Sequence, residues 1–345
     1  GTGFVGIRVP NHSIAQKILN ASQLPIAAPS ANRFGHVSPT KASHVFDDLG
    51  ISRGVAAIVS GDDGDSMETC EHGIESTVMK LDYTNRSLKV FRKGAVTMQQ
   101  LEALVAANKE LLSDTWTVES VSRTVNMHNN TSSDNTVSVA VVDTDGEQAP
   151  GQAITHYAPD NAVCIMPEIV DISRLGLDIQ SGTSDTIKKS DIDIESDSDL
   201  LSWDMSLVDL KSAVILDFAG QWRNLINQCF QRDVDDEDSP ILAYRDFSSD
   251  GSYKEAARSL FDVLRWAESV PNVKYVILAP MLKRLSIQLH SKSSDSETCS
   301  HMDATIAAFA TGTGDVDGIR EGVQDRLFRS ASGRVVHLKL QLAKE

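Results

Sequence analysis

Several features that mark other protein classes are scarce in this sequence. The four cysteines, Cys70, Cys164, Cys229 and Cys299, lie far apart and form no CxxC pair, so a zinc knuckle or a disulfide framework has little support. Lys and Arg number 32 against 48 Asp and Glu, which gives a net charge of −16. Such a charge opposes binding to a phosphate backbone. We therefore expect a protein of a reducing compartment that does not bind nucleic acid directly, tRNA included.

Long apolar runs and the P-loop motif are also missing. No run approaches the ~20 residues that cross a bilayer, and residues 1–10 lack the basic and apolar parts of a signal peptide. The P-loop pattern GxxxxGK[ST] does not occur, so any ATP site must be of a type other than the P-loop. We expect a cytoplasmic protein without a membrane partner, and a mitochondrial form is the alternative.

The residues that are present indicate a folded protein of two domains. The length of 345 residues exceeds the usual size of a single core, and 41% hydrophobic and 23% charged residues are typical of globular chains. The chain begins at Gly1 without methionine, directly before a strand-like segment. We therefore expect that residues upstream of Gly1 are missing.

Residues 1–107 alternate short apolar runs with helical patterns, which indicates an α/β domain. The expected strands are Phe4–Val9, Val55–Val59, Ser76–Leu81 and Leu88–Phe91, and the expected helices are Ser13–Ala21 and Thr97–Ala107. Ser38 and Pro39 are typical of an N-cap and a first helical turn. They predict a further helix with Ala42, Val45, Phe46 and Leu49 on its apolar face.

Residues 108–160 are rich in polar residues, Gly and Pro, and we interpret them as a linker. Residues 161–345 are expected to form a second α/β domain with a parallel sheet. Its expected strands are Ala162–Met166, Ala213–Asp217, Ile241–Tyr244 and Val273–Leu278, and its expected helices are Gln221–Phe230, Tyr253–Ala267 and Gly318–Arg329. Three acidic, Ser-rich segments are expected to be exposed, mobile insertions: Ser181–Asp199, Asp233–Ser239 and Ser291–Asp303.

Two polar segments could carry chemistry. The loop from Ala27 to Thr40 joins an apolar run to the expected helix, as an anion-binding loop would, although an ordinary capped loop has the same residues. In the second segment, Cys70 and His72 have neither a third metal ligand nor an orienting carboxylate specified. We therefore identify no metal site and no catalytic nucleophile.

Arginines and an aromatic pair complete the candidates. Arg8 and Arg92 each follow a strand-like run, where a guanidinium could bind a carboxylate or a phosphate in bidentate fashion, or could simply be solvated. His156 and Tyr157 precede Pro159 in the expected linker. They are typical either of an aromatic anchor against a neighbouring domain or of a lid over a nucleotide.

Taken together, these segments resemble the YrdC-like threonylcarbamoyl-AMP synthases. The resemblance rests on Val5–Pro10, Leu24–Thr40, Gly73–Val78 and Pro150–Pro159, in that order and spacing. Glu255–Phe261 and Gly318–Leu327 are similar to the accessory domain of the long, two-domain form of this family. The resemblance implies a partial, twisted YrdC-like α/β domain, a linker, and a smaller Rossmann-like α/β domain.

The resemblance also implies an activity, because these enzymes join L-threonine, bicarbonate and ATP into threonylcarbamoyl-AMP and release pyrophosphate. Mg²⁺ is expected mainly through the triphosphate, and the downstream partner is the machinery that transfers the threonylcarbamoyl group to tRNA. By correspondence, the threonine-binding residues are Arg8, Ala28 through its backbone, and Ser76. The ATP-binding residues are Phe4 through its backbone, Ser30, Asn32 as a support of the loop, Ser38, Arg92 and Tyr157.

The sequence departs from the family pattern at several positions. Lys93 stands where the family has a proline, and Ala153 and Thr155 stand where a basic residue precedes its His-Tyr pair. The family's threonine-recognition strand and its Lys/Arg phosphate motif come before the part matched by Val5–Pro10. This chain is therefore expected to supply only part of the site and to be inactive as a fragment by itself. The alternative interpretation is a non-catalytic nucleotide- or RNA-binding regulatory module with the same fold.

Overall fold

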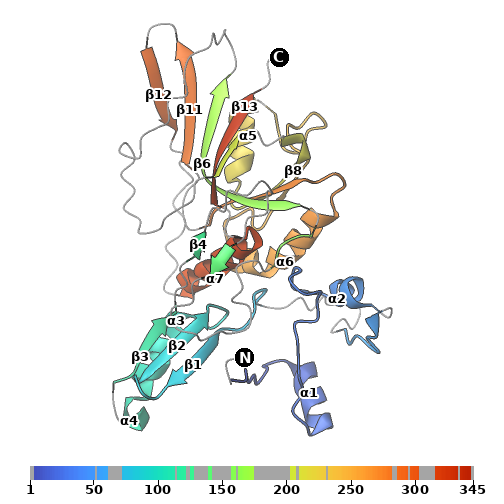
Figure 1. The fold of residues 1–345 in the computed structure, drawn as a ribbon, viewed down its shortest axis with the longest axis vertical. Helices are drawn as coiled ribbons and strands as arrows, with labels where there is room; N and C mark the ends of the chain where they lie inside the picture. The colour runs from blue at the N-terminus through green and yellow to red at the C-terminus, as the bar shows by residue number, and fades with distance from the viewer. Residues whose placement is uncertain are drawn as a thin grey trace.

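The fold is mixed α/β, as the sequence predicts, and the described residues form one large and two small sheets. The computed structural model describes residues 4–50, 53–60, 72–112, 115–121, 125–127, 139–141, 157–160, 162–174, 203–206, 210–230, 232–281, 286–293, 296–302, 315–332 and 335–342. Figure 1 shows helices α6 and α7 between the large sheet and a three-stranded sheet, with α1 and α2 to one side. Two parts of the chain that are far apart in sequence therefore meet at α6 and α7.

The three-stranded sheet is built mainly from the end of the first predicted domain. Strands β1 (Val78–Asp82) and β2 (Ser87–Arg92) pair antiparallel, and β2 pairs parallel with β3 (Thr117–Ser120). Helix α3 (Met98–Ala107) connects β2 to β3 and begins with a capping box between Thr97 and Gln100. The predicted helix and both predicted strands of this stretch are confirmed with small shifts of their ends.

The segment before this sheet is less regular than predicted. Helix α1 (Ser13–Ser22) is confirmed, but Phe4–Val9 and Val55–Val59 are not strands. The side chains of Val5, Ile7 and Val9 are 81, 86 and 89% exposed. A strand needs a neighbouring strand for its backbone groups, and among the described residues these segments pair with none.

Helix α2 begins later than predicted. It spans Ala42–Leu49, with Lys41 rather than Ser38 at its N-cap. The Ser38 hydroxyl donates instead to the side chain of Glu75. A tertiary hydrogen bond has therefore replaced the local cap that the Ser-Pro pattern predicts.

The large sheet is the core of the second predicted domain, and its parallel strands are confirmed. Strands β6 (Val163–Arg174), β10 (Tyr275–Leu278), β8 (Ala213–Asp217) and β9 (Ala243–Asp246) lie side by side in that order, all parallel. The residues of β8 are all buried, as expected for a strand that is covered on both faces.

Three helices pack against this sheet: α5 (Gln221–Phe230), α6 (Tyr253–Ser269) and α7 (Asp315–Ser330). Seven residues of α6, Ala256, Ala257, Leu260, Phe261, Val263, Leu264 and Ala267, are buried and follow the helical period. Their apolar cluster extends to Val37, Ile74 and Tyr157 from outside the second predicted domain. One continuous core therefore joins the two halves of the chain.

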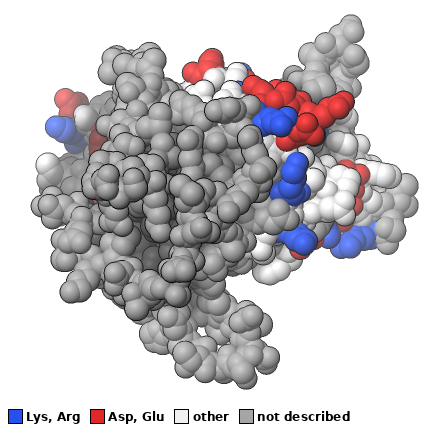
Figure 2. All heavy atoms as spheres, turned by 90° about the horizontal axis from the view of Figure 1, so that it is seen from above, with Lys and Arg blue, Asp and Glu red and all other residues white. Residues whose placement is uncertain are grey.

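Two predicted insertions are structured. The segment Ser291–Asp303 lies largely in an antiparallel pair, β11 (Ser286–Ser293) with β12 (Ser296–Met302), at the edge of the large sheet. Asp233–Ser239 forms a turn whose acidic side chains bind Arg223 and Arg232. Acidic and basic side chains lie side by side on the face seen in Figure 2. The third segment, Ser181–Asp199, is outside the described residues.

The remaining elements are short or peripheral: α4 (Lys109–Leu112), β4 (Val125–Met127), β5 (Val139–Val141), β7 (Trp203–Ser206), the 3₁₀ turn Leu210–Ser212 and β13 (Val335–Leu342). Strand β13 pairs with β6 and β7. The predicted linker, residues 108–160, thus contains α4, β3, β4 and β5. The division of the chain at 107 and 160 stays a prediction. No helix among the described residues is long and apolar enough to span a membrane.

Candidate functional site

The segment from Gly73 to Glu75 lies against helices of the second half of the chain. Gly73 has a φ of +68°, and a Cβ there would overlap the Ala257 carbonyl of α6. Gly322 of α7 lies so close that its Cβ would be 3.0 Å from Ile74 Cδ1. Glycine at both positions lets backbones and side chains approach closely. Helices α6 and α7 therefore fix the position of Glu75, which follows Ile74 and precedes strand β1.

Glu75 connects both halves of the chain through its two carboxylate oxygens. Its Oε1 accepts a hydrogen bond from Ser38 Oγ at 3.0 Å, and its Oε2 lies 3.1 Å from Nε of Arg326 on α7. Arg326 and Arg92 lower the pKa of Glu75, although burial opposes them. Glu75 therefore remains ionised and accepts hydrogen bonds from Ser38 and Arg326.

Arg92 and Tyr157 lie beside this carboxylate. Arg92 ends β2, is buried, and donates from Nε and Nη2 to the Ser76 carbonyl at 3.1 and 3.0 Å. Tyr157 is 1% exposed, and its ring centroid lies 5.2 Å from that of Phe261 on α6. Burial and the charge of Glu75 raise the pKa of Tyr157, so its hydroxyl keeps its proton. A cation, two hydroxyls and a carboxylate are thus assembled in one place.

The other residues predicted from the resemblance are placed differently. Phe4 is 64% exposed and lies under Lys80 Nζ, 4.3 Å from its ring centroid. Ala28, Ser30 and Ser76 are exposed. Arg8 is exposed as well. These residues are therefore open to solvent, whereas Ser38, Arg92 and Tyr157 are buried. Burial is the main cause that lowers the pKa of Arg92, and the charges of Arg326 and Arg8 lower it further.

Asn32 makes hydrogen bonds within its own loop. Its Nδ2 donates to the carbonyls of Arg33 and His36, at 3.0 and 2.8 Å. These bonds close the loop that leads to Ser38. His156 and Cys70, by contrast, are outside the described residues, and His72 is exposed.

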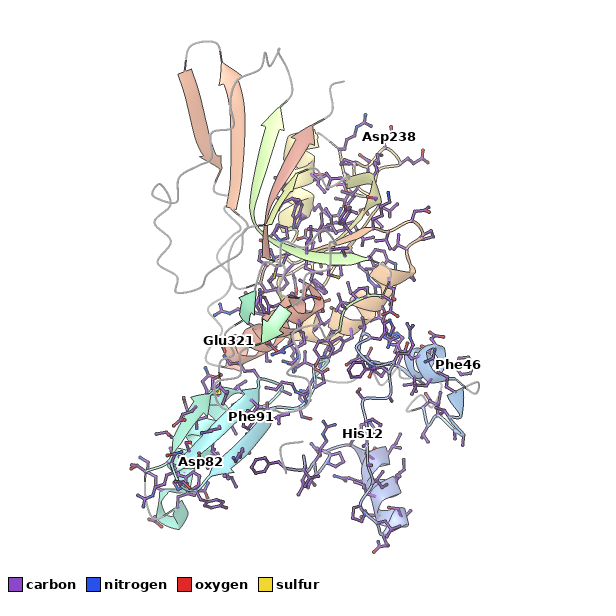
Figure 3. All side chains as sticks on the ribbon, in the orientation of Figure 1. His12, Phe46, Asp82, Phe91, Asp238 and Glu321 are labelled. Atoms are coloured by element: carbon purple, nitrogen blue, oxygen red, sulfur yellow. The ribbon has the colours of Figure 1, made fainter. Side chains whose placement is uncertain are left out.

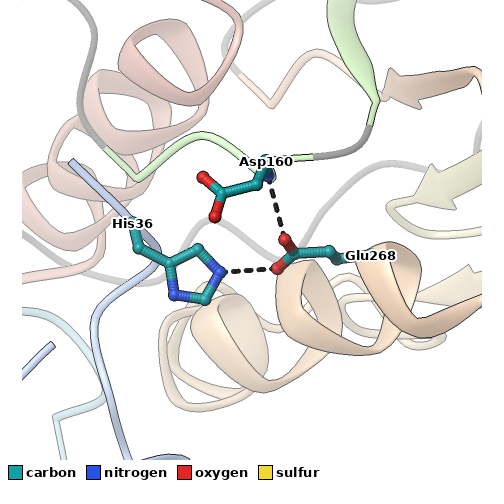
Figure 4. A group of neighbouring side chains, drawn as sticks. All are labelled: His36, Asp160 and Glu268. Carbon is teal, nitrogen blue, oxygen red and sulfur yellow. Dashed lines mark hydrogen bonds and ion pairs between the residues drawn. The ribbon is translucent and has the colours of Figure 1, made fainter. Parts of the chain in front are cut away.

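A second polar cluster joins the same loop to α6 (Figure 4). His36 Nε2 lies 2.6 Å from Glu268 Oε2, and His36 Nδ1 lies 3.0 Å from Asp48 Oδ1. The hydrogen bond to Glu268 raises the pKa of His36, and so does the bond to Asp48, although burial opposes both. Arg265 and His36 lower the pKa of Asp48 to about 2 despite its burial. The arrangement is that of a protonated imidazole between two carboxylates.

This second cluster also meets the simplest geometric requirement of a metal site. Ligand atoms of His36, Asp160 and Glu268 lie within 4.8 Å of one another. However, Asp160 Oδ2 lies 2.7 Å from Arg33 Nη1, and Glu268 Oε1 accepts from the Asp160 backbone N–H. Because every ligand residue already has a charged or hydrogen-bonded partner, the cluster is complete as an ion-pair network.

Sequence reasoning missed four residues that organise these clusters: Glu75, Arg326, His36 and Glu268. Glu75 lies inside a quoted motif, and Arg326 lies in the segment similar to the accessory domain. The two are 251 positions apart. A charged residue on an amphipathic helix is usually solvated, so no local pattern indicates such a contact.

Two family models match adjacent parts of the chain. One, described as telomere recombination, matches residues 1–94. The other, described as the C-terminal domain of threonylcarbamoyl-AMP synthase, matches residues 96–332. Ser38, Glu75 and Arg92 fall in the first region, and Tyr157 and Arg326 fall in the second. The contacts around Glu75 therefore cross the boundary between the two regions.

Curated relatives match parts of the chain. The threonylcarbamoyl-AMP synthase of Bacillus subtilis is 41% identical over 105 residues, which are 30% of this chain and 28% of that protein. The synthase of Pyrococcus abyssi is 29% identical over 166 residues, which are 48% of this chain and 38% of that protein. The chain thus spans less than half the length of these relatives.

A similar solved structure is that of P. abyssi Sua5 complexed with L-threonine. It is 18% identical, has a TM-score of 0.46, and the match covers 96% of this chain and 65% of that one. The family assignment comes from the sequence matches. Since the second family model spans more than half of the 345 residues, this chain belongs to the threonylcarbamoyl-AMP synthase family.

Proposed function

We propose that this chain acts as an L-threonylcarbamoyladenylate synthase, a nucleotidyltransferase that uses L-threonine, bicarbonate and ATP. The observation that carries the proposal is the buried group of Ser38, Arg92 and Tyr157 around Glu75. A buried arginine with hydroxyl donors is typical of sites for phosphate or carboxylate groups. The names of the curated relatives support this reaction.

The proposed chemistry needs binding and shielding more than a protein nucleophile. The threonine amine attacks the carbon of bicarbonate, water leaves, and a carbamate forms. A carbamate oxygen then attacks the α-phosphorus of ATP, the bond between the α- and β-phosphates breaks, and pyrophosphate leaves. Arg92 and Ser38 would bind ATP and stabilise charge on the transferring group, and Arg8 would bind the threonine carboxylate.

Mg²⁺ is proposed to enter with the triphosphate. Among the described residues, the group of side chains close enough to share a cation is His36, Asp160 and Glu268. Its imidazole and its paired carboxylates do not fit an ion that prefers octahedral oxygen ligands and retains several waters. The phosphates themselves are the better ligands. We also propose the cytoplasm as the compartment and the tRNA threonylcarbamoyl-transfer machinery as the consumer of the product.

The direct test is pyrophosphate release by the protein that contains this chain together with the family's Lys/Arg phosphate motif, with the 345-residue chain alone measured beside it and expected to be inactive. We expect release only when ATP, L-threonine and bicarbonate are all present, because the carbamate forms before the α-phosphate is attacked. Release at the same rate without threonine contradicts the proposal. Binding of ATP with no release under any combination favours the alternative of a non-catalytic nucleotide-binding module.

Arg8→Ala tests the threonine contact. A charge-assisted bidentate contact to a carboxylate contributes about 2 kcal/mol, so the threonine KM should rise roughly 30-fold while the ATP KM changes little. Arg232→Ala is the matched control, because Arg232 is exposed and pairs with Asp238 in a remote turn. A threonine KM that is the same in all three proteins refutes the role of Arg8.

A further inference from the structure

Arg326 of α7 is a buried cation that contacts residues outside its own helix. Its side chain is 0% exposed, although it lies in the middle of α7. Nε donates to Glu75 Oε2 at 3.1 Å, while Nη1 donates to the Gly322 carbonyl at 3.1 Å and to the Lys93 carbonyl. A buried guanidinium costs less where its charge is compensated and its donors are engaged. Here Nε and Nη1 are engaged, while Nη2 has no hydrogen-bond partner among the described residues. Glu75 compensates the charge from the other family region, and Asp325 Oδ2 of α7 itself lies 3.6 Å from Nη1.

The second carboxylate oxygen of Glu75 contacts a residue of the proposed ATP site. Oε1 accepts from Ser38 Oγ at 3.0 Å, so Arg326 and Ser38 bind opposite oxygens of one carboxylate. Arg92 is the next cation that acts on Glu75, and its guanidinium donates to the Ser76 carbonyl. If Arg326 were removed, the partly buried carboxylate would be drawn toward Arg92, and both the Ser38 and the Ser76 contacts would change.

We propose that Arg326 is a positioning residue for the ATP and threonine site. By holding one oxygen of Glu75 it fixes the Ser38 hydroxyl, and it leaves Arg92 bound to the Ser76 backbone. The site in the first family region is then competent only while α7 of the second region is packed against it. This inference rests on the proposed function, because Ser38, Arg92 and Ser76 are proposed substrate contacts.

The geometry also explains why arginine is required at this position. Three acceptors, on Glu75, Lys93 and Gly322, surround one planar group. A guanidinium reaches them with donors in a fixed fork, whereas a lysine ammonium is a single point on a flexible stem. Arg326→Lys therefore keeps the buried positive charge but cannot make all three of these hydrogen bonds.

A matched control lies on the same helix. Glu321 of α7 pairs with Lys93 Nζ at 2.7 Å, and the two side chains are 42 and 34% exposed. Figure 3 shows Glu321 on α7, above Phe91 of the three-stranded sheet. Glu321→Gln thus removes an ion pair between the same two family regions without touching Glu75. Exposed pairs of this kind contribute little to stability.

The experiment compares wild type, Arg326→Lys, Arg326→Met and Glu321→Gln by ATP titration calorimetry, steady-state kinetics and thermal unfolding. Loss of a charge-assisted contact should weaken ATP binding about tenfold or more in both Arg326 variants. Arg326→Lys should retain a wild-type unfolding temperature to within a few degrees, and Glu321→Gln should change affinity less than about twofold. The thermal data separate a folding defect from a loss of positioning.

A double variant tests the route through Glu75. If Arg326 acts through that carboxylate, Arg326→Met should weaken ATP binding much less in a Glu75→Gln background than in wild type. Three outcomes overturn the inference. The first is wild-type ATP affinity in folded Arg326→Lys, and the second is an equal loss of ATP affinity in Arg326→Lys and Glu321→Gln. The third is a double variant in which the fold-losses of ATP affinity from the two single changes simply multiply.

Hydrogen exchange separates this inference from the proposed function. Arg326→Lys should accelerate exchange in residues 36–40 and 73–77, and Glu321→Gln should not, whatever ligand the site takes. If wild type binds neither ATP nor threonine, the proposed function fails. The exchange comparison then decides by itself whether Arg326 positions Glu75 and Ser38, and unchanged exchange in Arg326→Lys refutes it.

Discussion

At the scale of single residues, His36 makes stability depend on pH. The bond to Glu268 raises its pKa above 6.5. Folding therefore favours the protonated form, and the contribution is complete below pH 6.5 and lost as the pH rises through the folded-state pKa. We expect His36→Gln to cost about 1–2 kcal/mol at pH 6 and less at pH 8.5, measured by urea unfolding.

His44 is the matched control for this prediction because its pKa is shifted in the opposite direction. It lies on the neighbouring helix α2, and burial lowers its pKa below 6.5. Its contribution should be complete above pH 6.5 and lost as the pH falls, so His44→Gln should cost more at pH 8.5 than at pH 6. The same pH trend in both variants would contradict the two assignments.

At the scale of elements, the approach of α6 to Gly73 predicts a strong effect of one methyl group. Gly73→Ala places a Cβ against the Ala257 carbonyl at a φ of +68° and should cost about 3 kcal/mol or more. Gly35→Ala has a similar φ of +81° but meets nothing within 4 Å, so it should cost only about 1 kcal/mol. Equal losses in urea unfolding would show that α6 does not enclose Gly73.

The start of α5 carries another pH dependence. Asp217 accepts from the backbone N–H groups of Trp222 and Arg223, at 2.9 and 3.1 Å, and burial raises its pKa to about 6. A raised carboxyl pKa stabilises the fold fully below pH 3.8, and this contribution is lost as the pH rises through about 6. Asp217→Ala should therefore cost about 2 kcal/mol at pH 5 and less at pH 8.

Asp250→Ala is the comparison for Asp217, since hydrogen bonding from Ser248 lowers the pKa of Asp250. The effect of this variant should be present above pH 3.8 and should diminish only as the pH falls below it. A cost of Asp217→Ala that grows between pH 5 and pH 8 would show that folding favours its charged form instead.

Helices and strands that are specified by their own residues alone were predictable from sequence. The limits of α5 and β8 match the structure, because helical periodicity and an unbroken apolar run each specify an element by themselves. Phe4–Val9 has an equally strong strand pattern, yet it is not a strand among the described residues. The apolar sequence pattern shows that a segment favours the strand conformation, but a strand also needs a neighbouring strand to pair with.

At the scale of the whole molecule, the family and the α/β fold class were predictable, whereas the contacts that unite the chain were not. The motifs around Ser38, Glu75 and Tyr157 carried the resemblance. The clusters that join them to α6 and α7 depend on charges separated by more than 200 positions, such as His36 with Glu268. Such pairs depend on the tertiary fold, which brings α6 and α7 against residues that are distant in sequence.

The most direct test of the account follows the carbon of bicarbonate. The protein that contains this chain together with the family's Lys/Arg phosphate motif is incubated with ATP, L-threonine and isotopically labelled bicarbonate, and nucleotide products are separated and analysed by mass spectrometry. We predict labelled threonylcarbamoyl-AMP in amounts equal to the pyrophosphate released, and loss of both when threonine is omitted. Pyrophosphate release without label in any AMP-containing product would contradict the proposed synthase reaction.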